Sequence, residues 1–329
     1  PFMDQNAKRL GEEPIAKLLV GFSAPAIVGT IVTSMYSVID RIFVGHVVGS
    51  FAIVGMGLTF PISLVLMAFG MLIGIGTSAR ISISLGRKDI EGANRILGNA
   101  FSLVLIASVA LTTAGIALLD PILSLFGSSP DTLPYARQFI EIILLGTVFQ
   151  FIGFGLNGVI GAEGHPGISM MTMLLNASLN VIFLVLFIYV LGWGVRGSAL
   201  ATLIAQAASA AWVFGFLRSN KSMLKIKLRH MQLDRRIVAG IVSIGMAPFA
   251  MQMAGSFVNA ILNRALKAHG GDMAVGAMSA IFALTMLMVM PVVGINHGMQ
   301  PIAGFNFGAE KYDRVRKTLK LAIIGATIH

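Results

Sequence analysis

Three acidic residues lie inside or beside long apolar stretches of this sequence, where a carboxylate is costly and is usually functional. Asp40 interrupts the run Val-Ile-Asp-Arg-Ile-Phe-Val-Gly at 38–45, while Glu141 and Glu163 lie near the start and the end of a later apolar run. A carboxylate that has lost part of its hydration can exchange a proton near neutral pH, or hold Na⁺ when other oxygen atoms complete the site. These residues therefore predict cation chemistry.

Each of these carboxylates also has a simpler interpretation. Asp40 comes 23 residues after Lys17, or about 35 Å along a helix, which is near a membrane boundary where it would only pair with Arg41. Glu163 lies in a turn that would simply face the cytosol, and Glu141 has the position of an interfacial residue. Position in the sequence leaves both interpretations of Asp40 and of Glu163 open.

A second group of candidates is polar but uncharged and falls on apolar helices. Amide side chains in lipid must find hydrogen-bond partners, so they point into a helix bundle. Asn176 and Asn180 share a helix face at i, i+4, and Thr202 lies on the next helix. Such residues either join helices or line a water-filled cavity. The candidates for a cavity that holds varied ligands are Asn157, Asn176, Gln252, Asn259 and, because methionine adapts its shape, Met35.

The composition shows what kind of protein must position these residues. Of the 329 residues, 56% are hydrophobic and only 12% are charged, about half the charge of an average soluble domain. This excludes a soluble enzyme, a secreted disulfide scaffold and a disordered regulator. The absence of cysteine excludes disulfides and thiolate metal sites. The class that remains is a polytopic membrane protein.

Nine apolar runs are long enough, or nearly so, to cross a bilayer as helices of about 20 residues. Because lipid offers no partners to backbone groups, these runs predict an all-α bundle with eight complete spans and part of a ninth. The predicted spans are Ile15–Ile39, Phe51–Ala79, Ile96–Leu119, Pro134–Ile160, Ile168–Leu191, Gly197–Leu217, Ile237–Leu262, Met273–Ile302 and a run from Thr318 that the chain does not complete. We expect the chain to be part of a longer protein.

The positive charges predict the orientation of the spans. The net charge is +10, but 19 of the 24 Lys and Arg residues fall in segments that share one side if the N-terminus is cytoplasmic. The positive-inside rule therefore predicts a cytoplasmic N-terminus. It also accounts for the charge without a nucleic-acid partner. The partners that remain are the lipid bilayer and small molecules.

An internal repeat divides the chain into two bundles. Residues 23–25 match 246–248, and Asp40-Arg41 matches Asn263-Arg264 at the same offset of 223. Six helices separate the two copies, so both enter the membrane from the same side and are related by an axis along the membrane normal. We therefore predict a six-helix bundle at 1–217, a basic cytoplasmic linker at 218–235, and part of a second bundle at 236–329.

Nucleotide chemistry finds no support in the sequence motifs. Residues 192–197 satisfy G-x-G-x-x-G, but they follow an apolar helix rather than a strand, so a tight turn between helices is the better interpretation. The sequence contains no P-loop motif, and His297 has no second histidine at the spacing of a metal site.

The whole chain resembles the MATE (multidrug and toxic compound extrusion) family, and in particular its MepA-like bacterial branch. The resemblance rests on the run at 38–45, on Gly-Val-Arg-Gly-Ser-Ala-Leu-Ala-Thr at 194–202, and on Gln-Pro-Ile-Ala-Gly-Phe-Asn-Phe-Gly-Ala at 300–309. It implies two six-helix bundles in a V-shaped pair. It also implies export of cationic amphipathic compounds across the bacterial inner membrane, driven by H⁺ or Na⁺, with no cofactor, no catalysis and no obligate protein partner.

The resemblance assigns ion coupling to Asp40, with Asn180 and Thr202 as polar partners in the same bundle and Glu163 as a further acidic position. The chain departs from the family pattern at Leu184, where an aspartate is common, and this places more weight on Asp40. Any Na⁺ site would be at Asp40. The alternatives are a lipid-linked oligosaccharide flippase of the same superfamily, which needs several basic residues in its cavity, and a non-transporting membrane protein, which needs a catalytic motif that the sequence lacks.

Overall fold

The computed structural model describes residues 9–328, and 88% of the chain is helical, with no strand among the residues described. This confirms the predicted all-α polytopic fold. The elements are α2 (Ile15–Val47), α3 (Ser50–Gly86), α4 (Ile90–Ala117), α5 (Leu119–Leu125), α6 (Leu133–Leu145), α7 (Thr147–Gln150), η1 (Phe151–Gly155), α8 (Asn157–Ala162), α9 (Pro166–Val185), η2 (Leu186–Val190), α10 (Gly194–Arg218), η3 (Leu228–His230), α11 (Arg235–Gly308) and α12 (Tyr312–Ile328).

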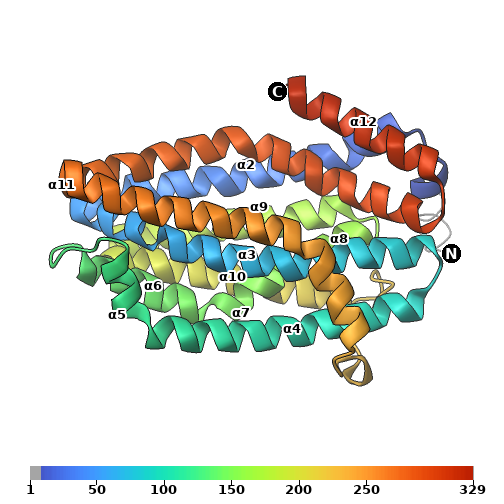
Figure 1. The fold of residues 1–329 in the computed structure, drawn as a ribbon, viewed down its shortest axis with the longest axis horizontal. Helices are drawn as coiled ribbons and strands as arrows, with labels where there is room; N and C mark the ends of the chain where they lie inside the picture. The colour runs from blue at the N-terminus through green and yellow to red at the C-terminus, as the bar shows by residue number, and fades with distance from the viewer. Residues whose placement is uncertain (1–8, 329) are drawn as a thin grey trace.

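The long helices lie side by side along the long axis of the molecule (Figure 1). Six helices in the described part of the chain are long and apolar enough to cross a membrane, and α6 with α7–α8 makes a seventh if that bent pair counts as one span. The helix α11 is itself two helices, because Gly271 has a non-helical φ of 67°. Its first arm (235–270) and second arm (272–308) take the places of the seventh and eighth predicted spans.

Several helices are longer than the apolar runs that predicted them. The helix α2 continues to Val47 instead of ending at Ile39, so Asp40 lies inside the helix. The helix α4 begins at Ile90 instead of Ile96, and its Asp89 cap accepts a hydrogen bond from the Gly92 amide at 2.8 Å. Charged residues such as Asp40 and Arg41 interrupt an apolar run, but a helix continues through them because its backbone hydrogen bonds do not depend on side-chain polarity.

The predicted single span Pro134–Ile160 was wrong in one respect, because it is broken. The helix α6 ends at Leu145, and the chain bends by 58° before α7, η1 and α8 continue it. The segment η1 is a π-helix, and its glycines pack closely on neighbours. A Cβ on Gly74 of α3 would meet the backbone of Gly155, which explains why two glycines face each other there. Hydropathy does not register such a bend, because the residues on both sides are equally apolar.

The turn between η2 and α10 matches the prediction from its glycines. Gly192 and Gly194 have φ values of 67° and 56°, in the left-handed region that favours glycine. The Trp193 amide donates to the Phe187 carbonyl at 2.9 Å, which closes the turn. The G-x-G-x-x-G pattern at this place is therefore a helix–helix turn.

The basic segment between α10 and α11 is held by hydrogen bonds to α4. Asn99 of α4 donates to the His230 carbonyl at 3.1 Å and accepts from the Asp234 amide at 2.7 Å. Asn94 accepts from the Lys225 amide at 2.8 Å, and Ser102 donates to the Met231 carbonyl at 2.6 Å. Three polar residues of α4 thus hold this linker on the N-terminal half of the structure.

Candidate functional site

Asp40 is a buried carboxylate two turns before the end of α2. Its residue is 8% exposed, and its Oδ1 accepts a hydrogen bond of 2.6 Å from the hydroxyl of Ser198, near the start of α10. Ser198 is 158 positions away in the sequence. A hydrogen bond to a charged group is stronger than one between neutral groups and fixes both side chains. The carboxylate therefore ties α2 to α10.

The hydrogen bonds continue from Ser198 to a third helix. The Thr202 hydroxyl donates to the Ser198 carbonyl at 3.2 Å and accepts from the Asn180 amide nitrogen at 3.0 Å. Asn180 lies on α9 and is 1% exposed, and its Oδ1 accepts no hydrogen bond from the described residues. The structure thus brings Asp40, Asn180 and Thr202 into one chain that joins α2, α10 and α9.

Ser198 is the member of this chain that the sequence prediction missed. It precedes Thr202 by four residues, so the two share one face of α10. That spacing is a signal that the sequence offered, but a serine in a helix is so common that the spacing alone carries little weight. Leu184, at the position where the family pattern has an acid, is fully buried among apolar side chains that include Val44 and Phe187.

Arg41 does not pair with Asp40, although the two are adjacent in the sequence. Its Nη1 donates to the Ser279 carbonyl at 2.8 Å and also contacts the Ser279 hydroxyl, on the second arm of α11. Its guanidinium lies 5.9 Å from the ring centre of Phe60. Of the ion pairs between described residues, none includes Asp40. The interfacial Asp40–Arg41 pair is therefore not formed.

Glu163 lies elsewhere, at the end of α8. Asn180 is 14 residues into α9, or about 21 Å along the helix axis from the turn that holds Glu163. Glu163 is 1% exposed, and its carboxylate accepts from the Ser222 hydroxyl at 2.8 Å and from the Met223 amide at 2.9 Å. Burial raises the pKa of Glu163 to about 7, against the opposite effect of these hydrogen bonds and of Lys225. The simpler interpretation, in which Glu163 faces water, is therefore wrong.

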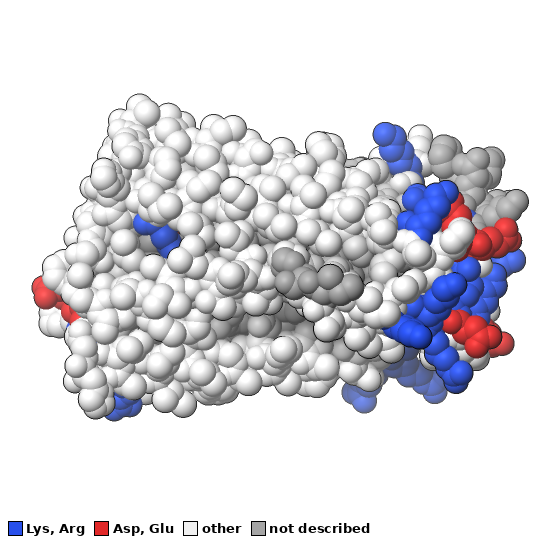
Figure 2. All heavy atoms as spheres, turned by 90° about the horizontal axis from the view of Figure 1, so that it is seen from above, with Lys and Arg blue, Asp and Glu red and all other residues white. Residues whose placement is uncertain are grey.

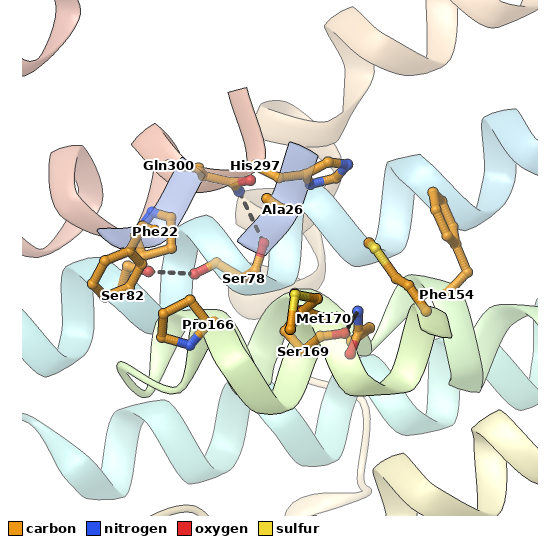
Figure 3. Close-up of a pocket in the computed structure, with 15 residues that line it drawn as sticks. Phe22, Ala26, Ser78, Ser82, Phe154, Pro166, Ser169, Met170, His297 and Gln300 are labelled. Atoms are coloured by element: carbon orange, nitrogen blue, oxygen red, sulfur yellow. Dashed lines mark hydrogen bonds between the residues drawn. The ribbon is translucent and has the colours of Figure 1, made fainter. Parts of the chain in front are cut away.

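One of the predicted cavity residues lines a cavity in the structure. Asn157, at the start of α8, contributes to a cavity of about 50 Å³, measured for the centres of water-sized molecules, between α2, α3, α8, α9 and the second arm of α11. Its amide nitrogen donates to the Ser169 carbonyl at 3.1 Å. Figure 3 shows Gln300 of α11 hydrogen-bonded to Ser78 of α3, with His297 beside it, and Met170 of α9 on the other side of this space.

The other predicted cavity residues do not line this cavity. Met35 is 48% exposed on α2, and Asn176 and Gln252 are partly buried on α9 and on the first arm of α11. Asn259 is 8% exposed and donates to the carbonyl of Gly255 in its own helix at 2.9 Å. Glu141, the third acid, is part of an exposed cluster in which Arg137 donates to it at 2.7 Å.

The charged residues gather at one end of the molecule, and Figure 2 shows Lys and Arg crowded there beside a long uncharged middle. We call this end of the molecule the basic end. The helices α2, α4 and α12 begin there, and the linker lies there too (Figure 1). Asp40 lies toward the opposite end. Among residues 9–328, no group of three His, Cys, Asp or Glu side chains could hold a metal ion.

Comparisons with known proteins agree with this architecture. The model of the MatE family matches residues 25–186 and 248–328. The multidrug export protein MepA of Staphylococcus haemolyticus (strain JCSC1435) is 29% identical over 318 residues, which cover 96% of this chain and 70% of that protein. The MepA protein of Staphylococcus aureus (strain MSSA476) is 27% identical over 98% of this chain and 71% of its own length.

A solved structure is similar over the same extent. The MATE multidrug transporter DinF-BH in complex with rhodamine 6G superimposes with a TM-score of 0.91 and 35% sequence identity. The match covers 97% of this chain and 72% of that one.

Proposed function

The chain belongs to the MatE family of multidrug efflux transporters, and from that premise we propose that it is a secondary active antiporter. It exports cationic amphipathic compounds in exchange for H⁺ or Na⁺, and two bundles rock so that a cavity faces each side of the membrane in turn. The mechanism uses no cofactor beyond the coupling ion, no obligate protein partner and no chemical reaction.

The observation that carries this proposal is the hydrogen-bonded chain from Asp40 through Ser198 and Thr202 to Asn180. A carboxylate removed from water is costly unless a cation or hydrogen bonds stabilise it. Asp40 has one hydroxyl donor and no ion pair among the described residues. Binding of a proton or Na⁺ to Asp40 is therefore favourable, because it neutralises a buried charge.

Coupling follows from the position of this carboxylate between helices. A proton, a Na⁺ ion and a cationic substrate each neutralise Asp40, so they compete for the same charge. A ligand shifts a conformational equilibrium only by the difference in its affinity for the two states. Because Asp40 holds α2 on α10 through Ser198, a change in its charge changes the free energy of that helix contact. Ion binding at Asp40 therefore shifts the balance between the two conformations, and this shift releases the substrate.

Glu163 is the second titrating carboxylate in this proposal. Its pKa of about 7 lets it change charge near neutral pH. It binds the linker through Ser222 and Met223, so its charge acts on the connection between the two bundles rather than on α2. A second role at the opposite end from Asp40 suits a transporter that must open at each end in turn.

The predicted cavity residues are proposed to contact substrate at different stages of transport. Asn157 lines the cavity of Figure 3, and the described residues around that space include no Lys or Arg. An uncharged lining supports a cationic substrate, whereas a diphosphate-linked lipid would need basic residues there. Met35, Asn176, Gln252 and Asn259 lie on helices of both bundles and would line the path in another conformation.

We place the protein in the bacterial inner membrane with its N-terminus in the cytoplasm. The support for this orientation is the concentration of Lys and Arg at the basic end (Figure 2), which the positive-inside rule assigns to the cytoplasm. The proposed organisation has an N-terminal bundle at 1–217, a linker at 218–235 and part of a C-terminal bundle at 236–329. The hydrogen bonds of the linker to Asn94 and Asn99 make it move with the N-terminal bundle.

The test is transport by the purified protein in vesicles loaded with rhodamine 6G, the compound bound by the solved MATE relative. A pH gradient and a Na⁺ gradient are imposed separately, and release of this dye is followed. We expect one gradient to drive release by the wild type, and Asp40→Asn to reduce release to the level of protein-free vesicles, because the variant has no carboxylate to neutralise.

The matched control is Asp131→Asn, which removes an exposed acid from the loop before α6. Release by this variant should equal that of the wild type. Gradient-driven release by Asp40→Asn at the wild-type rate would overturn the proposal. Absence of release under both gradients in the wild type, with purified lipid-linked oligosaccharide scrambled instead, would favour a flippase.

A further inference from the structure

The cavity of Figure 3 contains a titratable residue that the proposed mechanism does not use. His297 lies on the second arm of α11 and is the one titratable side chain among the described residues that line the cavity. Its ring meets the ring of Phe154 edge-on, with centroids 6.5 Å apart. No hydrogen bond joins His297 to another described residue, so its ring nitrogens are available to the cavity.

The backbone of α11 holds this histidine in place. Gly294 and Gly298 lie against the backbone of α2 at Ile27 and Ser23, where a Cβ on either glycine would collide. Such close contact between helices is typical of small residues in membrane proteins. His297 and Gln300 stand beside Gly298, so the contact with α2 fixes both side chains at the cavity wall.

The cavity offers neutral oxygen atoms to a ligand. Asn157 is 3% exposed, and its Oδ1 accepts no hydrogen bond from the described residues. Gln300 donates from its Nε2 to Ser78 Oγ at 2.9 Å and to the Ile75 carbonyl at 3.0 Å, and its Oε1 is a further acceptor on the same side chain. A buried acceptor without a donor is costly, so the Asn157 oxygen favours a ligand that is positive or that donates hydrogen bonds.

The cavity also offers aromatic rings. Phe154 of η1 lines it together with the side chains of Met170 and Met173, and so does Phe22 of α2, whose ring already has the Arg9 guanidinium 5.8 Å from its centre. A cation near the face of an aromatic ring is attracted by the ring quadrupole, more strongly where water is excluded. The cavity volume of about 50 Å³ holds roughly four water molecules at 10–15 Å³ each. This suits a compact head group rather than a whole drug molecule.

No charged group in the described part of the chain faces His297 inside the cavity. The lining from α2, α3, η1, α8, α9 and α11 is otherwise uncharged. The charged or titratable groups that flank it turn elsewhere: Arg80 of α3 lies over Gly240, and Glu163 is bonded to the linker. His165 packs its ring on Phe216, at 5.5 Å between centroids. Arg9 lies over the Phe22 ring, 5.8 Å from its centre, but does not line the cavity, so among the described lining residues only His297 can change its charge.

We propose that this cavity binds the head group of an organic cation and that a proton on His297 expels it. The inference rests on the proposed function for its place in transport, since it gives the cation a waiting site near the basic end. With His297 neutral, the oxygens of Asn157 and Gln300 and the aromatic rings hold the cation. With His297 protonated, a second positive charge occupies the same small space and repels it. Proton and cation thus compete at a place separate from Asp40.

The test is binding of radiolabelled tetramethylammonium to the purified protein by equilibrium dialysis, with no gradient present. All proteins carry Asp40→Asn, so that pH cannot act through that carboxylate. We expect affinity to fall at least about tenfold from pH 8 to pH 4.5, because a histidine, with an ordinary pKa near 6.5, is protonated at the lower pH and the two positive charges repel each other in the cavity. His297→Gln should bind equally at both pH values, with the affinity of the parent at pH 8.

The matched control is His269→Gln, which removes an exposed histidine near the Gly271 turn. It should keep the tenfold fall. Asn157→Ala and Gln300→Ala should each weaken binding at pH 8, and two variants guard against one that fails to fold. A tenfold fall retained by His297→Gln, or no binding by the parent at pH 8, overturns the inference. Normal binding in this assay, together with no gradient-driven release of the rhodamine dye by the wild type, would instead contradict only the proposed function.

Discussion

Asp40 and Glu163 are both buried carboxylates that accept a hydrogen bond from a serine, but the serines belong to different kinds of structure. Ser198 lies on the long helix α10, and its hydroxyl is 2.6 Å from Asp40. Ser222 lies on the linker, and its hydroxyl is 2.8 Å from Glu163. The first bond joins two membrane-spanning helices, whereas the second joins a helix end to an irregular segment.

The difference lies in what each carboxylate can move. Beyond Ser198 the hydrogen bonds continue to Thr202 and Asn180, so Asp40 acts on the packing of three helices. Glu163 also accepts from the Met223 backbone amide, so its charge acts on whether the linker stays docked. A rigid helix transmits a change along its whole length, while an irregular segment can open locally. We therefore expect strong effects on transport at Asp40 and effects on the linker at Glu163.

Among variants that keep both carboxylates, the largest effect should come from removing the serine beside Asp40. Ser198→Ala deletes a hydrogen bond to a charged group, which contributes about 1.5–3 kcal/mol, and gradient-driven release of the rhodamine dye should fall about 10- to 100-fold. Ser222→Ala should keep release within about twofold of the wild type. The measurement is the initial rate of release from vesicles. Ser198→Thr, which retains a hydroxyl, should recover most of the rate, and equal losses in both alanine variants would erase the distinction between the two carboxylates.

The next effect is a pH-dependent opening of the linker. The folded pKa of Glu163 is raised to about 7 from an ordinary value of 4.5. A raised acid favours the docked state fully below the ordinary pKa, and this stabilisation is lost as pH rises through the folded pKa. Linkage then predicts about tenfold more opening at pH 8 than at pH 6. Glu163→Gln, which does not titrate, should show no such change.

A single thiol measures this opening, because the chain contains no cysteine. Leu224→Cys places a thiol at a fully buried linker position, and Leu228→Cys places one at a position that is 85% exposed. The ratio of their maleimide labelling rates cancels the pH dependence of the thiol itself. A ratio that stays constant from pH 6 to pH 8 in the wild type would show that Glu163 does not control docking.

The smallest effect should come from the other end of the linker. Asn99→Ala removes two hydrogen bonds, to the His230 carbonyl and from the Asp234 amide, worth roughly 1 kcal/mol net. The Leu224→Cys labelling ratio should rise about fivefold at every pH. Gradient-driven release of the dye should still depend on Asp40. If Asn99→Ala instead abolished that dependence, docking of the linker and ion coupling would be one process.

The membrane spans were predictable because each is a local property of the chain. A run of apolar residues must leave water, and a helix satisfies its own backbone, so α2, α3, α4, α9 and α10 follow from hydropathy. The bend at Gly146 was not predictable, because it depends on the packing of η1 against α3 and α10. The docking of the linker on Asn94 and Asn99 was missed for a similar reason, since asparagines in a helix have many roles.

The site shows the same division at the level of single residues. The scarcity of acids in apolar surroundings singled out Asp40 and Glu163, and the cost of a polar side chain in lipid singled out Asn180 and Thr202, which the family resemblance then assigned to ion coupling. Ser198 remained hidden because serine is common in helices and only its distance to Asp40 reveals its role. Arg41 was a plausible partner by sequence, yet the structure turns it toward Ser279 on the second arm of α11.

The sequence by itself determined which residues enter the membrane and which few carboxylates enter with them, because hydration free energy depends mainly on the chemical group. The tertiary structure alone decided what each carboxylate does. Asp40 meets a donor 158 residues away, and Glu163 meets one 59 residues away. No local pattern specifies such contacts, because they depend on how whole helices pack. Through that packing Asp40 contacts the helix α10, and Glu163 contacts the linker.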